Sequence, residues 1–427
     1  MQQLFHSFER KAPPGAENRM KNYLFPADIL LPDFSKTDGT RWATVACDQY
    51  TSEPEYWEAA ERLVGDAPST LRLMLPEARL SEAAVSVPGI QRTMREYLAG
   101  GILREHKNCG VYLERTLADG KIRRGLVACI DLNDYDYSAG SASPVRATEK
   151  TVAERIPPRL AVRRGAPVEM PHVMLLIDDK ENTVLGRFAG RKPDAYEFPL
   201  MADSGSVAAS FVAADEFAGI NGALNVLAAG RDNPIVLAVG DGNHSLATAK
   251  AAYEEIRAAV GEEAAANHPA RYALVEVVNI YDESLQFEPI YRLVKTEDPQ
   301  KLIADFAEYL DTENGAAPAQ TFTLITENGE GTLSTPIAPY ALPVTTLQRF
   351  LDDWAGENPS ETDYIHGEDS LCKLAQKEGF VGFLFEGMRK EELFPSVETD
   401  GSLPRKTFSM GHAADKRFYI ECRKIEK

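Results

Sequence analysis

The sequence predicts an α/β protein with mixed sheets and packed helices, and three observations favour this fold class. Short apolar runs typical of buried strands alternate with amphipathic segments typical of helices. The alternation follows no strict βαβ rhythm, which favours mixed rather than purely parallel sheets. At 427 residues the chain is long enough for two or three domains. We expect boundaries near residues 200 and 300, which gives regions 1–200, 201–300 and 301–427.

The first region carries signals for one helix and two hairpins. Ser52 and Glu55 have the spacing of a capping box, which predicts a helix just after them. Two alternating apolar runs flank Asp119-Gly120, a dipeptide typical of tight hairpin turns. The stretch 172–188 has a similar pattern and predicts a second hairpin around residues 178–182.

The later regions continue the mixture of helices and strands. We expect a helix over 213–230, a short buried strand over 233–240, and two further strands over 271–280 and 288–295. Beyond residue 298 the pattern predicts a helix containing Leu302, Phe306 and Leu310, then paired strands. Two more helices are expected, over 343–355 and 369–377.

Composition narrows the classes of function. The net charge of −19 argues against a nucleic-acid partner, because such binding needs clustered Lys and Arg. A small anionic substrate stays open, since a few local cations can outweigh charges screened over ~8–10 Å. Five scattered cysteines without a CxxC pair predict a reducing environment. No apolar run approaches the ~18 residues of a membrane span, and no secretory signal is seen, so we expect a cytoplasmic protein.

The most unusual stretch is "VGDGNHSLATAK", residues 239–250. Glycines directly after a buried strand let backbone N–H groups face outward, and Ser245 suits the N-cap of the helix that follows. Free N–H groups at a helix start favour an anion such as phosphate. Asp241 is then a candidate magnesium ligand or base, and His244 a candidate donor to phosphoryl oxygens. The alternative is ordinary turn chemistry, and neither the Walker P-loop nor the GxGxxG spacing is present.

A helix terminus alone cannot hold a phosphate compound tightly. It contributes up to ~2 kcal/mol, whereas micromolar affinity needs about 8 kcal/mol. Cationic side chains must therefore converge from elsewhere, although each one alone is also explained as a solvated surface charge. The candidates in polar segments are Arg146, Arg155, Arg159, Arg163, Arg164, Arg292, Arg405 and Lys406.

Several segments resemble domain-of-unknown-function family 1015 (DUF 1015). Asp241, Gly242 and His244 match its Asp-Gly-His-His-Arg signature, with Asn243 in place of the first histidine and Ser245 in place of the arginine. Further matching positions along the chain are Asp48 in "CDQY", Glu149 and Thr151 in "ATEKT", Arg159-Leu160, Arg292 in "EPIYRL" and the "LPRKTF" segment. The family name carries no activity.

A more distant resemblance implies a chemistry. The stretch "NVLAAGRDNPIVLAVGDGNHSLATA" resembles the ParB/sulfiredoxin-like domain and, within that superfamily, the free serine kinases. This resemblance implies that Glu149 is the general base, that Asp241 and His244 serve phosphoryl transfer, and that ATP or ADP is the donor.

The same resemblance implies the binding residues. Gly242, Asn243 and Ser245 would cradle phosphate. Because Ser245 replaces an arginine, Arg159, Arg292 or Lys406 would supply the missing cation, and Asp48 would also belong to the substrate site.

The sequence therefore predicts an enzyme of small phosphorylated metabolites, in its sharpest version phosphoryl transfer to free serine, with Mg²⁺ as the metal. Two alternatives stay open. One is a phosphoserine phosphatase, and the other is a non-catalytic sensor of a nucleotide or phosphorylated amino acid. We expect a small-molecule substrate and neither a nucleic-acid nor a membrane partner, and the composition is compatible with a homo-oligomer.

Overall fold

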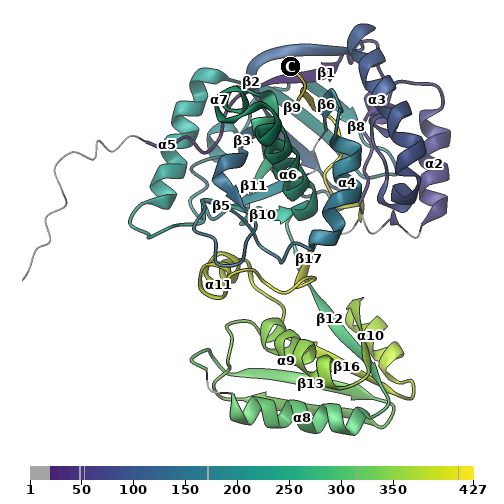
Figure 1. The fold of residues 1–427 in the computed structure, drawn as a ribbon, viewed down its shortest axis with the longest axis vertical. Helices are drawn as coiled ribbons and strands as arrows, with labels where there is room; N and C mark the ends of the chain where they lie inside the picture. The colour runs from purple at the N-terminus through teal and green to yellow at the C-terminus, as the bar shows by residue number, and fades with distance from the viewer. Residues whose placement is uncertain (1–19, 48–49, 52, 171–172, 314, 412) are drawn as a thin grey trace, which may run out of the picture.

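The computed structural model describes residues 20–47, 50–51, 53–170, 173–313, 315–411 and 413–427. It is a mixed α/β fold built on two sheets of unequal size. In Figure 1 the large sheet lies above the small one, and β12 and β17 run between them.

The large sheet has twelve strands among the described residues, with the order β4-β5-β10-β7-β11-β3-β2-β1-β18-β6 and with β9 and β8 extending from β2. Its strands are β1 (Ala27–Pro32), β2 (Leu103–Thr116), β3 (Ile122–Asp131), β4 (Tyr135–Asp136), β5 (Val145–Ala147), β6 (Val168–Glu169), β7 (Met174–Ile177), β8 (Tyr196–Pro199), β9 (Ser206–Ala213), β10 (Leu237–Asp241), β11 (Tyr272–Asn279) and β18 (Cys422–Lys424).

The small sheet has the order β14-β13-β16-β12-β15, and β17 pairs with the first part of β12. Its strands are β12 (Phe287–Thr296), β13 (Gln320–Thr326), β14 (Gly329–Thr335), β15 (Ser360–His366), β16 (Phe380–Phe385) and β17 (Phe408–Met410).

The helices are α1 (Gly39–Trp42), α2 (Pro54–Val64), α3 (Ala83–Ala99), α4 (Ile156–Arg163), α5 (Phe217–Ala228), α6 (Asn243–Val260), α7 (Glu262–Ala266), α8 (Pro299–Thr312), α9 (Pro343–Glu357), α10 (Glu368–Ala375) and α11 (Leu393–Asp400). None of them is long and apolar enough to span a bilayer, within the residues that the structure describes. The expected helix after Ser52 is present as α2, but Ser52 itself lies outside the described residues.

Helices cover both faces of the small sheet. Val294 joins a core with residues of α8 and α9, including Phe306 and Phe350. Its neighbour Leu293 joins a separate core with Leu371 of α10. Because successive side chains of a strand point to opposite faces, α8 and α9 cover one face and α10 covers the other.

The predicted hairpin around Asp119-Gly120 is confirmed. Strands β2 and β3 pair antiparallel from Val111↔Val127 to Thr116↔Ile122. Gly120 has φ 85°, the left-handed conformation that this turn requires and that glycine adopts without steric cost.

The predicted hairpin around residues 178–182 is wrong. Strand β7 pairs instead with β10 and β11, and a short 3-10 helix at Gly186–Phe188 follows it. The reason is the buried side chain of Asp179, which accepts hydrogen bonds from the backbone N–H of Val184 at 2.8 Å and from the hydroxyl of Thr183 at 3.2 Å. These bonds close a local turn where a returning strand was expected.

The expected boundaries at residues 200 and 300 stay a prediction. Strands β8 and β9, on either side of residue 200, pair with each other in the large sheet. The small sheet draws its strands from residues 287–385 and from β17.

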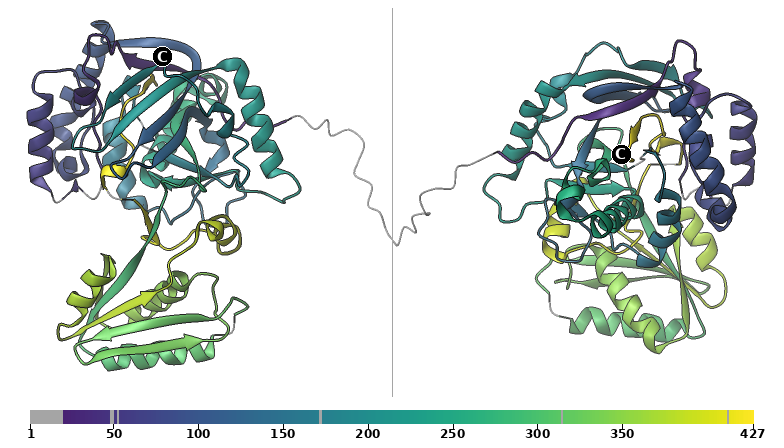
Figure 2. Two further views of the ribbon diagram at one scale, coloured as in Figure 1. Left: turned by 180° about the vertical axis from the view of Figure 1, so that it is seen from behind. Right: turned by 45° about the horizontal axis from the view of Figure 1, so that its top comes forward.

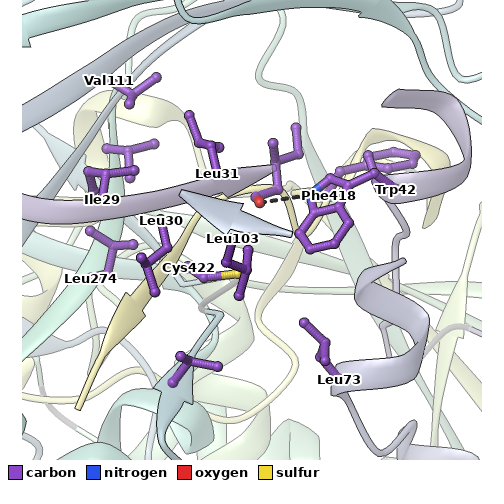
Figure 3. Packing of buried hydrophobic residues seen from close by; sticks show 14 of the residues in the cluster. Ile29, Leu30, Leu31, Trp42, Leu73, Leu103, Val111, Leu274, Phe418 and Cys422 are labelled. Atoms are coloured by element: carbon purple, nitrogen blue, oxygen red, sulfur yellow. Dashed lines mark hydrogen bonds between the residues drawn. The ribbon is translucent and has the colours of Figure 1, made fainter. Parts of the chain in front are cut away.

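The end of the chain returns to its beginning. Strand β18 pairs antiparallel with β1, and the C-terminus lies next to this pair in Figures 1 and 2. Figure 3 shows the core around it, in which the indole Nε1 of Trp42 donates a hydrogen bond to the backbone carbonyl of Ile420 at 2.9 Å. Trp42 is fully buried, so this bond ties the early helix α1 to the C-terminal segment.

We predict that Trp42→Phe lowers the free energy of unfolding by about 1–3 kcal/mol, because it leaves a buried carbonyl without a donor. Urea denaturation followed by circular dichroism measures the change. Val85→Ala, at a side chain that is 85% exposed, is the control and should change the free energy by less than about 0.5 kcal/mol. A loss as small as the control's for Trp42→Phe would contradict the anchoring role.

Candidate functional site

The site begins where two neighbouring parallel strands end. Strand β5 pairs in parallel with β10, in the register Val239↔Ala147. Two residues beyond this pair, Glu149 follows β5 and Asp241 ends β10. The hydroxyl of Thr148 donates to the carbonyl of Val239 at 2.7 Å, which fixes the two strand ends together. In open α/β sheets, ligands bind outside such carboxyl ends.

A glycine then turns the chain into helix α6. Gly242 has φ 86° and ψ 25°, and a Cβ atom there would lie 3.0 Å from the backbone of Val173. The helix begins at Asn243, so the prediction of Ser245 as N-cap is wrong, and Ser245 lies in the first turn instead. The left-handed glycine provides the helix start that a capping side chain was expected to make.

One cavity of about 560 Å³ contains most of the predicted site. The predicted residues that line it are Glu149, Arg159, Asp241, Gly242, Asn243, His244, Ser245 and Lys406. Residues of the small sheet, including Tyr364 and His366, also line it. Asp48 lies outside the described residues, and Arg292 is not among the lining residues.

The cavity has an apolar part and a cationic part. Apolar side chains of α3, α4, α6 and the 3-10 helix Thr70–Leu73 line it, among them Leu73, Met94, Val162 and Leu246. Four acidic residues line it, against eight basic ones: Lys150, Arg155, Arg159, Arg163, Arg405, Lys406, Lys416 and Arg417. In a chain with a net charge of −19, this excess of basic residues favours an anionic ligand.

Glu149 has the properties of a general base. Its side chain faces the cavity, and its carboxylate accepts a hydrogen bond from the backbone N–H of Thr407 at 3.3 Å. Burial raises the pKa of Glu149 from 4.5 to about 7, although the backbone N–H groups of Lys406 and Thr407 favour the charged form. A carboxyl with a pKa near neutrality can both accept and return a proton.

Asp241 is held on both oxygens. Its Oδ1 accepts the N–H of Gly242 at 2.8 Å, and its Oδ2 lies 3.1 Å from the Nζ of Lys416. An unpaired carboxylate 4 Å from a phosphate charge would repel it by about 4 kcal/mol at an effective dielectric constant of 20. The lysine offsets this repulsion.

The described residues form no all-protein cage for a metal ion. Among the described residues, no three His, Cys, Asp or Glu side chains cluster closely enough to hold one, and Asp241 already has a lysine partner. Magnesium at Asp241 therefore stays a prediction.

His244 connects the two strand ends. Its Nε2 accepts a hydrogen bond from the backbone N–H of Val152 at 3.2 Å. The bond holds the segment after β5 against the first turn of α6. The role of His244 as a donor to a phosphoryl oxygen stays a prediction.

The predicted cations have different surroundings. Arg159 pairs with Glu77 at 2.7 Å and is partly buried in the cavity wall. Arg155 is exposed, and so is Lys150, to which the sequence did not point; neither makes an ion pair with another described residue. Lys406 has φ 57°, a left-handed conformation that is rare for a residue other than glycine, so its backbone N–H points at Glu149 at a cost in strain.

Arg292 does not line the cavity but contacts residues that do. Its guanidinium is fully buried and donates to the carbonyls of Lys406 at 3.0 Å and Arg405 at 3.3 Å. It also stacks on Tyr364, whose hydroxyl accepts a bond from Arg405 at 2.8 Å. Burial lowers the pKa of Arg292 to about 10. In this position Arg292 holds the backbone of residues 405–406 in place. The sequence had predicted that its guanidinium binds the phosphate directly.

Sequence reasoning missed two groups of the site. Lys416 and Tyr364 both line the cavity, but each stands in an ordinary polar segment without a motif. His366 and Ser409 also line it.

Fold and site together define a mixed α/β protein with a cationic cavity at the ends of two parallel strands. The family model described as "Protein of unknown function (DUF1015)" matches residues 32–354, and the chain belongs to this family. No curated protein is significantly similar to it.

Several solved structures have a distantly similar fold. A variant of free serine kinase in complex with AMP is 12% identical with a TM-score of 0.38, over 72% of this chain and 92% of that one. A conserved hypothetical protein from Pyrococcus furiosus is 12% identical with a TM-score of 0.34, over 70% and 95%. SbnI with a C-terminal truncation, from Staphylococcus aureus, is 9% identical with a TM-score of 0.36, over 69% and 85%.

We predict that Glu149→Gln stabilises the protein at pH 8 but not at pH 4. The raised pKa means that the folded state binds more protons than the unfolded state between pH 4.5 and about 7, so the stability falls as the pH rises through this window. Glutamine removes this cost, which amounts to up to about 3 kcal/mol above pH 7.

Urea denaturation at pH 4 and pH 8 measures the difference. Glu154→Gln is the matched control, because Glu154 is exposed in the same segment and does not line the cavity. An equal effect of Glu149→Gln at both pH values would show that the Glu149 carboxyl is not perturbed.

Proposed function

We propose that this protein is a cytoplasmic enzyme that transfers a phosphoryl group from ATP or ADP to the hydroxyl of a small metabolite, with free serine as the acceptor. One observation carries the proposal. Glu149, with a pKa near 7, and the start of α6 with Asp241 line one cavity at the ends of adjacent parallel strands.

The proposed step needs a base and an anion site, and both are available. Glu149 takes the proton of the serine hydroxyl, whose oxygen bonds to the terminal phosphorus. The phosphorus–oxygen bond to the nucleotide breaks, and ATP leaves as ADP or ADP leaves as AMP. A positioned general base of this kind contributes about 10²–10⁴-fold to a rate.

The phosphate oxygens face the N–H groups of the first turn of α6. Gly242, Asn243 and Ser245 form this turn. The Asn243 Oδ1 is buried without a hydrogen-bond partner among the described residues, so it offers an acceptor to a ligand hydroxyl or ammonium group. Because the helix start supplies only ~2 kcal/mol, Lys406, Arg405 and Arg159 add charge around it.

Serine as the acceptor is supported by the motifs. Glu149 in "ATEKT" and Asp241-Gly242 with His244 match the positions that the free serine kinases use, by resemblance of sequence. A small amino acid also fits the polar end of the cavity, where the basic residues 405–406 can pair with its carboxylate.

Phosphorus NMR tests the proposal. We expect that the purified protein with magnesium and L-serine forms phosphoserine only when ATP or ADP is present. Glu149→Gln should lower the rate by about 10²–10⁴-fold, because the base is lost. Glu154→Gln should keep the parent rate, and circular dichroism should show that each variant is folded.

Two outcomes would contradict the kinase proposal. Release of free phosphate from phosphoserine without a nucleotide would make the protein a phosphatase acting at the same site. Binding of a nucleotide or phosphoserine that raises the melting temperature, with no turnover in either direction, would make it a sensor.

A further inference from the structure

Lys416 is a basic residue of the cavity that lies beside Asp241. Ser245 replaces the arginine that ends the motif in the resembling families, and the sequence pointed to Arg159, Arg292 or Lys406 as the substitute. In the structure the Nζ of Lys416 lies 3.1 Å from the Asp241 Oδ2, and both residues line the cavity.

The position of the ammonium group is well defined. The Lys416 side chain is 12% exposed, so its stem is enclosed by protein while its head faces the cavity. Asp241 is itself fixed, because its Oδ1 accepts the N–H of Gly242 at 2.8 Å. The ammonium group of Lys416 is therefore held beside Asp241, two residues before helix α6 begins at Asn243.

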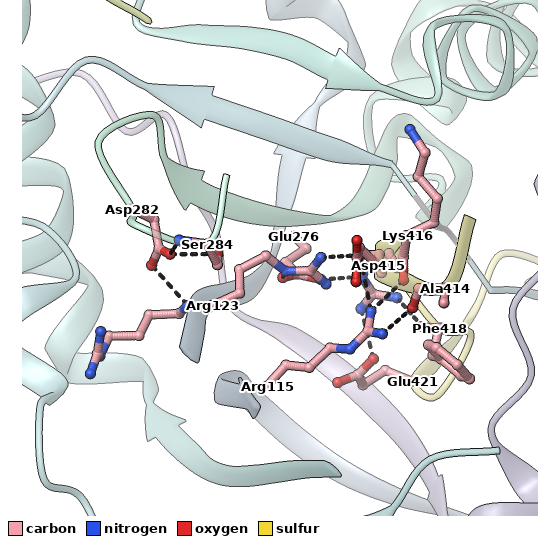
Figure 4. A network of polar contacts seen from close by, with 12 residues as sticks. Arg115, Arg123, Glu276, Asp282, Ser284, Ala414, Asp415, Lys416, Phe418 and Glu421 are labelled. Atoms are coloured by element: carbon pink, nitrogen blue, oxygen red, sulfur yellow. Dashed lines mark hydrogen bonds and ion pairs between the residues drawn. The ribbon is translucent and has the colours of Figure 1, made fainter. Parts of the chain in front are cut away.

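Two buried arginines fix the backbone that carries Lys416. Arg115 donates to the carbonyls of Ala414 and of Asp415, the latter at 3.0 Å. Arg123 donates to the same carbonyl of Asp415 at 2.6 Å. Figure 4 shows both guanidinium groups converging on this turn, with the Lys416 side chain extending away from them.

The next residue anchors the segment from the other side. The guanidinium of Arg417 pairs with Glu276 at 2.8 Å and with Glu421 at 2.7 Å, and all three side chains are almost fully buried. Burying so many charges around an irregular segment costs desolvation free energy. The backbone on both sides of Lys416 is thus fixed, while its side chain points away from this network and lines the cavity.

We propose that Lys416 is the phosphate-binding cation of the site, in place of the arginine that Ser245 replaces. The ligand it takes is a phosphate-bearing metabolite whose anion lies between Lys416 and the first turn of α6. Asp241 orients the ammonium group, and Lys416 in turn neutralises Asp241 so that the anion can approach. This inference rests on the proposed phosphate site.

Calorimetric titration with ADP and with phosphoserine tests this role without needing turnover. Lys416→Met should weaken binding of the phosphate compound by at least about tenfold, because a charge-assisted hydrogen bond is lost. Lys416→Arg should retain binding within about threefold, since a guanidinium group keeps the charge and also binds phosphate. Lys377→Met, which removes an exposed lysine that does not line the cavity, is the matched control and should bind like the parent.

A double variant separates this role from a purely structural one. With Lys416 removed, Asp241 repels the anion, so Asp241→Asn added to Lys416→Met should recover part of the lost affinity. A purely structural loss would also lower the melting temperature of unliganded Lys416→Met, which the double variant would restore, whereas a phosphate-binding role lowers the affinity while this melting temperature stays close to the parent's. Lys416→Gln keeps a polar head and serves as a second test if Lys416→Met folds poorly.

The outcomes distinguish this inference from the proposed function. If the parent protein binds neither compound, the phosphate site and the role of Lys416 both fall. If the parent binds and Lys416→Met binds equally well, the role of Lys416 is overturned and the proposed function stands. Weaker binding by Lys416→Met, with recovery in the double variant, supports the inference.

Discussion

The parallel pairing of β5 with β10 is the constraint on which the site depends. Its register, Val239↔Ala147, brings Glu149 and Asp241 to the same edge of the large sheet although 91 residues separate them in sequence. A shift of one residue would turn one of the two side chains to the opposite face. The hydrogen bond from Thr148 to the carbonyl of Val239 holds this register directly at the site.

The rest of the cavity is built by the return of the chain from the small sheet. The segment after α11 pairs with the end of β5 through the carbonyl of Thr148, which accepts the N–H of Leu403 at 2.7 Å. It then supplies Lys406 and Thr407 to Glu149, and Lys416 to Asp241, before β18 closes against β1. Each carboxylate of the site is thus held by contacts with a segment that is remote in sequence.

How much the sequence predicted depended on whether the signal was local. The hairpin at Asp119-Gly120 was predictable because turn chemistry and alternation agree there. The shared cavity of Glu149 and Asp241 was suggested by motifs alone, since no local pattern reveals a strand pairing. The turn around Asp179 was predicted as a hairpin because the sequence does not reveal the hydrogen bonds of the buried Asp179 side chain. Lys416 had no signal, because its position depends on Arg115 and Arg123.

The most direct test of this account is the titration of Glu149 itself. Carbon-13 NMR of the glutamate carboxyl groups, with Glu149→Gln to assign the signal, follows its pKa with and without bound ADP. We expect a pKa of about 7 in the free protein, raised further by ADP because a nearby anion disfavours the carboxylate. A pKa near 4.5 that ADP leaves unchanged would contradict a base and a phosphate site in one cavity.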